Sequence, residues 1–195
     1  MRILGSVLNL LDAEAALPVM HAHIATLRRY WPRDWSALEA QGELASCYHS
    51  LGRKEEALHL LRHIYKKRKA TKGPTDRSTI IDGCNLSHLA GTCGLYAEAR
   101  QLAREQLGVA RSALGDCNEV SVHAAKTLAL SLICFPTTRA NILEAEALIT
   151  DAISKSRWVV GAEHPRMREL GDALEKTRER LNMIDSGQIP DDYVY

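Results

Sequence analysis

Two histidine pairs have spacings that could place both side chains near one metal ion. His59 and His63 are four residues apart, so on a helix they would share one face. His21 and His23 are two residues apart and would point to different faces. A protein zinc site needs three or four ligands, and no third ligand lies at a suitable spacing from His59 and His63. We therefore interpret His59 and His63 as surface histidines, assign no metal role to His21 and His23, and expect no metal or other cofactor.

Cysteine chemistry is the second possibility. Cys84 and His88 would lie one helical turn apart, but a nucleophilic cysteine site also needs a third group and a pocket. Cys84 and Cys93 would be separated by roughly 13 Å along a helix, too far for a disulfide. The five cysteines are odd in number and contain no Cys-x-x-Cys motif. This usage indicates reduced thiols, mostly small buried hydrophobic residues, in a cytoplasmic type of compartment.

Other chemistry-bearing patterns are weak or missing. The sequence contains no phosphate-binding glycine loop, no dinucleotide-binding glycine motif and no Gly-x-Ser-x-Gly motif, so we expect no enzyme activity. The basic run from Arg62 to Lys72 could contact a phosphate or RNA, but cations also collect at solvated helix ends. Because 25 Lys and Arg balance 24 Asp and Glu, the composition argues against a nucleic-acid or acidic-membrane partner. No stretch approaches the roughly 18 apolar residues of a membrane span.

The elements that would position these residues are indicated by the stretch Leu51–Leu58, which reads as the turn of a helical hairpin. Gly52 interrupts the first helix, and Glu55 and Glu56 would lie in the first turn of the next, where negative charge suits the helix dipole. Ala57 is small, as required where two helices approach closely. Aromatic residues make up only 5% of the chain, which favours a helical protein over a β-sandwich.

The same signals recur at a fixed spacing along the chain. Alanines of similar Glu-Ala context are separated by 42, 42 and 46 residues, and a glycine follows each of the last three alanines after 16 residues. Agreement between two independent markers predicts a helical repeat array. The alanines are Ala15, Ala57, Ala99 and Ala145, and the glycines are Gly73, Gly115 and Gly161.

The repeats predict a series of helices and their ends. Asp12 and Asp34 are expected N-caps, and Pro18 is expected to kink or delay its helix. The turn at 134–141 holds the four additional residues of the 46-residue spacing. We expect one domain over 1–183, with repeats at 1–30, 35–72, 76–114 and 119–160, a charged capping helix at 164–183, and a disordered tail at 184–195. The predicted helices cover 1–11, 12–30, 35–50, 54–69, 76–92, 96–113, 119–134, 142–158 and a last segment that ends near Met183.

Taken together, these features resemble the tetratricopeptide repeats (TPRs) of kinesin light chains, over about residues 10–182. The run Gly161–Pro165 is similar to the loop between repeats of that family. The sequence departs from the pattern at Leu10, which replaces a turn glycine, and at Ala90, which replaces a large residue. The matching positions are Leu44, Ala45, Tyr48, Gly52 and Ala57, then Leu86, Ser87, Gly94 and Ala99, then Leu128, Ala129 and Ala145.

The resemblance implies an all-α fold, a right-handed α-α superhelix of about four helical hairpins plus a capping helix. It also implies a non-catalytic scaffold that binds a protein or peptide in a concave groove lined by the first helix of each pair. Asn85 matches a groove asparagine that bonds a bound peptide backbone, whereas the family's carboxylate-binding set is not reproduced. The implied groove residues are Glu39, Glu43, His49, Asn85, His88, His123, Lys126 and Thr127.

The expected first helix is about seven residues shorter than its counterparts. This leaves open an alternative function, in which the chain is the C-terminal TPR part of a larger multidomain signalling protein or enzyme. The sequence does not identify the partner or the oligomeric state.

Overall fold

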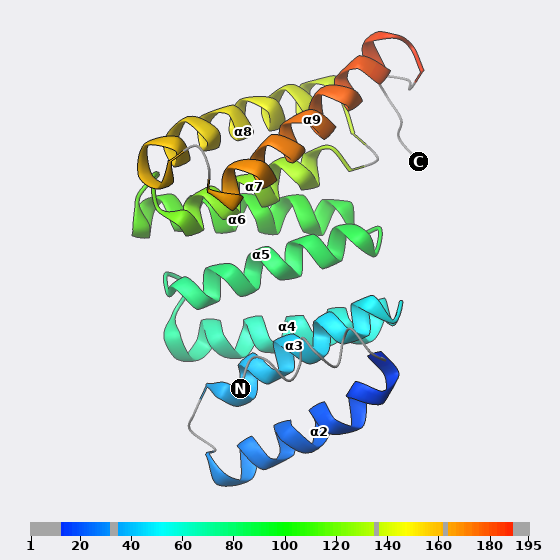
Figure 1. The fold of residues 1–195 in the computed structure, drawn as a ribbon, viewed down its shortest axis with the longest axis vertical. Helices are drawn as coiled ribbons and strands as arrows, with labels where there is room; N and C mark the ends of the chain where they lie inside the picture. Colours follow the sequence, from blue (N-terminus) through cyan, green and yellow to red (C-terminus); the bar gives the residue numbers. More distant parts are fainter. Residues whose placement is uncertain (1–12, 32–34, 135–136, 162–163, 189–195) are drawn as a thin grey trace. The chain divides into compact units, whose positions relative to one another are not determined.

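The computed structural model describes residues 13–31, 35–134, 137–161 and 164–188, and within them it contains helices and no strands (Figure 1). The expected helix at 1–11, the expected N-caps Asp12 and Asp34, and most of the expected disordered tail lie outside the described residues. The remaining predicted helices are present, so the all-α prediction is confirmed. They are α2 (Ala13–Tyr30), α3 (Ser36–Ser50), α4 (Lys54–Lys72), α5 (Arg77–Thr92), α6 (Tyr96–Leu114), α7 (Glu119–Leu132), α8 (Arg139–Val160) and α9 (Pro165–Asp185).

The chain divides into two compact units between Arg68 and Lys69, within α4, and each unit is described here by itself. The expectation of one domain over 1–183 stays a prediction. In the first unit, α2 packs on α3 through a stripe of buried side chains. Pro18 was expected either to kink this helix or to delay its start. The helix begins at Ala13, before Pro18, so its start is not delayed. The buried stripe of α2 comprises Ala16, Met20, Ile24 and Leu27.

The hairpin turn between α3 and α4 forms as predicted. Gly52 has a φ of 75°, in the left-handed region where a side chain is disfavoured, and the backbone N–H of Arg53 donates to the carbonyl of Tyr48 over 2.9 Å. Ala57 is fully buried, as its small size predicts. Its predicted counterpart Ala15 is exposed, whereas the adjacent Ala16 is fully buried. The 42-residue spacing is therefore wrong by one residue in the first repeat.

The second unit stacks α5, α7 and α9 in one layer, with α6 and α8 packed against them (Figure 1). α7 contacts α5, α6, α8 and α9, which makes it the centre of the core. The residues at the core are mainly small or aliphatic, and Leu132, Ile142, Ile149 and Leu170 are fully buried within it. Close packing of this kind needs little aromatic content, in agreement with the composition.

The connection between α7 and α8 is shorter than the sequence predicts. α7 ends at Leu132 and α8 begins at Arg139, so the predicted helix start at residue 142 is wrong by three residues. The reason is an N-cap: the hydroxyl oxygen of Thr138 accepts a hydrogen bond from the backbone N–H of Asn141. Part of the four-residue insertion therefore extends α8. α9 also ends two residues later than predicted, at Asp185.

Candidate peptide-binding groove

Two cavities lie along α5, α7 and α9 of the second unit. One is lined by the first halves of the three helices, including Ile81, His123 and Leu170, and has a volume of about 450 Å³; we call it the N-terminal cavity. The other is lined by their second halves, including His88, Leu130 and Arg180, and has a volume of about 470 Å³; we call it the C-terminal cavity. The three helices thus present corresponding halves to the two cavities, and we call the surface of α5, α7 and α9 that holds both cavities the groove.

The N-terminal cavity is lined by three cationic and two acidic side chains that form ion pairs. Glu119 on α7 lies between two arginines and pairs with Arg77 on α5 and with Arg166 on α9, the latter over 3.0 Å. Lys126 on α7 pairs with Glu169 on α9, and this hydrogen bond lowers the pKa of the Glu169 carboxyl. Ion pairs thus join α5, α7 and α9 across this half of the groove, with two carboxylates serving three cationic side chains.

His123 lies among these ion pairs and is half-buried. Burial lowers the pKa of its imidazole, and the neighbouring Lys126 lowers it further. The imidazole is therefore held in its neutral form near pH 7, in which one ring nitrogen donates and the other accepts a hydrogen bond.

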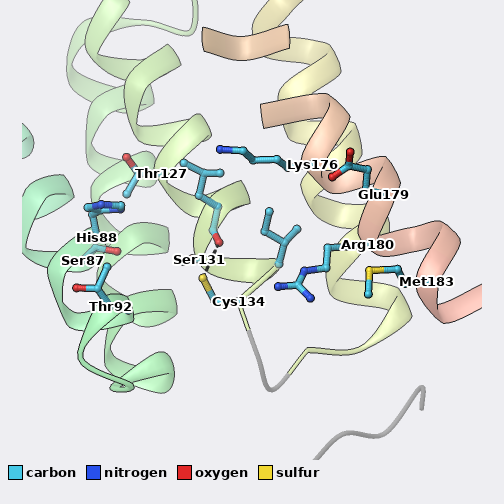
Figure 2. A pocket seen from close by; sticks show the side chains of 13 residues that line it. Ser87, His88, Thr92, Thr127, Ser131, Cys134, Lys176, Glu179, Arg180 and Met183 are labelled. Atoms are coloured by element: carbon cyan, nitrogen blue, oxygen red, sulfur yellow. Dashed lines mark hydrogen bonds between the residues drawn. The ribbon is translucent and has the colours of Figure 1, made fainter. Parts of the chain in front are cut away.

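The C-terminal cavity has a mainly apolar lining with a charged rim. Leu130 of α7, Ile133 at its C-cap and Met183 of α9 contribute to its lining. Figure 2 shows Lys176 and Arg180 reaching from α9 towards α7. The hydroxyl groups of α7 in this lining, and the thiol of Cys134 two residues beyond its end, donate to carbonyls of α7. Thr127 donates to His123 over 3.0 Å, Ser131 to Leu128 over 2.7 Å, and Cys134 to Leu130 over 3.2 Å.

The described lining of the C-terminal cavity holds two cationic side chains and one carboxylate. Lys176 has no ion-pair partner among the described residues, and Glu179 contributes the only carboxylate of the described lining. Apolar surface beside cationic groups suits a ligand that combines a nonpolar side chain with a carboxylate.

The structure places four of the residues implied by the family resemblance in these cavities. His88 and Thr127 line the C-terminal cavity, and His123 and Lys126 line the N-terminal one. Asn85 is exposed on α5 and belongs to neither described lining. In the first unit, Glu39 and Glu43 are exposed on α3 and His49 is half-buried.

The contribution of α9 was missed by the sequence analysis, which treated this helix as a cap. Arg166, Glu169, Lys176, Arg180 and Met183 all line the groove. A signal was present in the sequence. Gly73, Gly115 and Gly161 occupy the same position in successive repeats, so α9 begins where the first helix of another repeat would begin. The high charge of α9 is equally typical of a solvent-exposed capping helix, and the sequence analysis therefore interpreted α9 as a cap.

The first unit has a cavity of its own, about 470 Å³ in volume, between α2, α3 and α4. Its lining includes His21 and Tyr48, whose ring nitrogen and hydroxyl oxygen lie 3.0 Å apart. Glu39, Glu43 and His49 do not belong to this lining. That these three residues of α3 contact a ligand therefore remains a prediction.

The arrangement around Cys84 does not suit nucleophilic catalysis. Burial raises the pKa of the Cys84 thiol to about 12, whereas an activated cysteine has a lowered pKa. All five cysteines are free thiols, and only Cys117 is exposed. In the described part of the chain, no three histidine, cysteine or acidic side chains are grouped as a metal site would require. The helices described there also include none with the length and apolar character needed to cross a membrane.

Comparison with known proteins identifies the fold. No protein-family model matches the chain, and no curated protein matches it. Among solved structures, one crystal structure of the nearly identical TPR-like repeats of a Podosopora anserina kinesin light chain protein aligns with a TM-score of 0.74 at 18% identity, over 95% of this chain and 86% of that one. A second structure of these repeats aligns with a TM-score of 0.72 at 18% identity, over 95% and 87%. BtubC (BKLC) of P. vanneervenii aligns with a TM-score of 0.71 at 10% identity, over 100% and 80%. The chain therefore has the fold of a TPR-like helical repeat array of the kinesin light chain type.

Proposed function

We propose that this protein is a non-catalytic interaction scaffold that binds an extended peptide or a partner helix in the groove along α5, α7 and α9. One observation carries the proposal: two cavities of similar volume lie in register on the same three helices. A segment that follows the groove could place one apolar side chain in each cavity. The five free thiols support a reducing compartment such as the cytoplasm as its location.

The composition of the groove supports binding in preference to catalysis. Thr127 and Ser131 donate to carbonyls of their own helix, and Ser87 donates to the carbonyl of Ala99 on α6. The histidine at position 123 is held neutral by burial. Apolar lining with a polar rim is the usual composition of a peptide-binding surface. Asn85, which lies on the exposed face of α5, would contact a ligand that extends beyond the cavities.

Selection from a random peptide library on the immobilised full chain tests the proposal. We expect enriched peptides whose binding is lost in Leu130→Glu, because this change places a carboxylate in the apolar lining of the C-terminal cavity. The matched control is Leu143→Glu, at an exposed leucine of α8 that lines neither groove cavity.

Both variants should retain helical circular dichroism and a cooperative thermal transition. Peptides that bind wild type and Leu130→Glu equally, or that are lost only in Leu143→Glu, would exclude the groove as the binding surface. Failure to enrich any peptide above an unrelated helical protein would also count against the proposal.

A further inference from the structure

The two cavities of the groove repeat along the helices at a fixed spacing. Most of the described residues that line the N-terminal cavity have a counterpart eleven residues later in the lining of the C-terminal cavity, and such pairs occur on all three helices. Eleven residues are about three turns of an α-helix, or about 16.5 Å. Examples are Arg77 and His88 on α5, Val120 and Ser131 on α7, and Glu169 and Arg180 on α9.

This spacing decides which kind of segment can fill both cavities. We infer that the groove binds an amphipathic α-helix that lies lengthwise along α5, α7 and α9 and carries apolar side chains at positions i and i+11. The inference rests on the proposed function and chooses between the two kinds of ligand that it allows. Two observations carry it: the distance between the cavities, and the hydrogen bonds that the groups lining them already make.

The distance between the cavities matches a helix and not an extended segment. Helix positions i and i+11 are about 16.5 Å apart and differ by only about 20° around the axis, so both side chains would point into the groove. An extended segment rises about 3.3 Å per residue, and its side chains alternate between two faces. Its residues on one face are therefore about 13 Å apart at a spacing of four and about 20 Å apart at a spacing of six. A spacing of five fits the distance but turns the second side chain away from the groove.

The hydroxyl groups of the C-terminal lining are not available as donors to an extended backbone. All four that the structure describes there donate to backbone carbonyls of the protein: Ser87 to Ala99, Thr92 to Leu89, Thr127 to His123, and Ser131 to Leu128. The buried N–H and C=O groups of an extended ligand would need partners, whereas a helix pairs most of these groups within itself. A helical ligand therefore needs mainly apolar contact from the lining.

Each cavity supplies that apolar contact. Ile81 on α5 lines the N-terminal cavity and Leu130 on α7 lines the C-terminal one, and both are half-buried, so part of each side chain faces solvent. Lys176 and Arg180 lie across the C-terminal cavity from α7 and form its charged rim (Figure 2). One anchor of the partner helix would thus contact Ile81 and the other Leu130.

A phage-displayed library of helices, screened on the full chain, tests this inference. Each member is an Ala-Glu-Lys helix of about 20 residues in which one face is randomised. We expect enriched helices to carry apolar residues at two positions eleven apart. Alanine at either position should weaken binding about tenfold or more, through lost apolar burial. Proline midway between them should weaken it as strongly, because it breaks the helix.

The matched control peptide moves the second apolar residue to a spacing of nine. This change keeps the composition but turns the side chain to the opposite face of the helix, so binding should be lost as in the alanine variant. Double-mutant cycles then show which cavity holds each anchor. Ile81→Ala should couple to alanine at one anchor and Leu130→Ala to alanine at the other, while Leu143→Ala on α8 should couple to neither. Circular dichroism checks that all three variants stay folded.

Three results would overturn the inference: no enriched helix although random-library peptides bind, enriched peptides that tolerate proline and lack the eleven-residue spacing, or both anchors coupling to the same cavity. In each case, random-library peptides that lose binding in Leu130→Glu would leave the proposed function standing. Peptides that bind this variant as they bind wild type would remove both.

Discussion

Arg100 on α6 donates a hydrogen bond of 2.8 Å from its guanidinium to the carbonyl oxygen of Cys134, two residues beyond the end of α7. Its Nε donates a second bond of 3.2 Å to the carbonyl of Ser131. The last carbonyls of a helix have no partner within the helix, and they attract positive charge. A side chain of α6 therefore caps the helix at the centre of the second unit's core.

Replacing Arg100 by methionine should lower the free energy of unfolding by about 1.5–3 kcal/mol, because two hydrogen bonds from a charged donor are lost. Arg104→Met is the comparison: its ion pair with Glu144 is exposed, and such pairs contribute about 1 kcal/mol or less. Urea unfolding followed by circular dichroism measures both. Equal losses in the two variants would show that Arg100 does not act as a cap.

Gly83 on α5 is packed against Gln106 on α6. A Cβ at position 83 would lie 2.5 Å from Cδ of Gln106 and 2.7 Å from its Cγ, and Gln106 is itself buried. Gly83→Ala should therefore destabilise the protein by about 1–3 kcal/mol, despite the better helix propensity of alanine.

Gly108→Ala is the control for this glycine, since nothing lies within 4 Å of its added Cβ; it should stabilise α6 by up to about 1 kcal/mol. The Gly83→Ala loss should shrink when it is combined with Gln106→Ala, as measured in a double-mutant cycle of unfolding free energies. A strictly additive cycle would contradict the close contact.

Ala15 and Ala57 occupy the same repeat position by sequence but differ in burial. Ala57→Leu should cost about 1–3 kcal/mol through overpacking, because Ala57 is fully buried. Ala15→Leu should change the stability little, since Ala15 is exposed. Thermal unfolding of the two variants measures the difference. Comparable losses of stability would show that Ala15 is packed as Ala57 is, and that the 42-residue spacing holds in the first repeat.

His123 should make the stability depend on pH. Burial, assisted by the positive charges of Lys126, Arg166 and His88, lowers its pKa in the folded state below the usual value of 6.5, and Glu169 opposes the shift. The unfolded chain therefore binds this proton more readily, so stability falls as the pH is lowered through 6.5 towards the folded-state pKa.

His123→Gln should reduce the loss of unfolding free energy between pH 7.5 and 5.5. Urea unfolding at several pH values, in wild type and in the variant, checks this expectation. Identical pH dependence in the two proteins would mean that His123 is solvated enough to titrate equally in both states.

Much of the helical architecture could be predicted from the sequence, because single residues mark the turns and the close contacts between helices. Gly52 and Gly94 mark hairpin turns through their own backbone geometry, and Ala57, Ala99 and Ala145 mark the close approach of helices. The start of α8 was misplaced because Thr138 caps the helix, which therefore begins at Arg139, three residues before the expected start.

The groove was harder to predict, because its charges are set by partners in the next repeat. Lys126 was expected to face a ligand, but it pairs with Glu169, 43 residues further along the chain. The sequence identified His88, His123 and Thr127 by repeat phase but could not say which cavity each lines. The cations of α9 at positions 176 and 180 were overlooked because a charged terminal helix resembles a solvated end until its packing against α7 is known.

The most direct test of the groove is an NMR titration of the isotope-labelled full chain with a library-selected peptide. The account predicts that the largest amide shifts fall on α5, α7 and α9, around His88, Leu130 and Arg180, and that Leu130→Glu abolishes them. Shifts confined to α6 and α8 in wild type, with no response at those three positions, would contradict it.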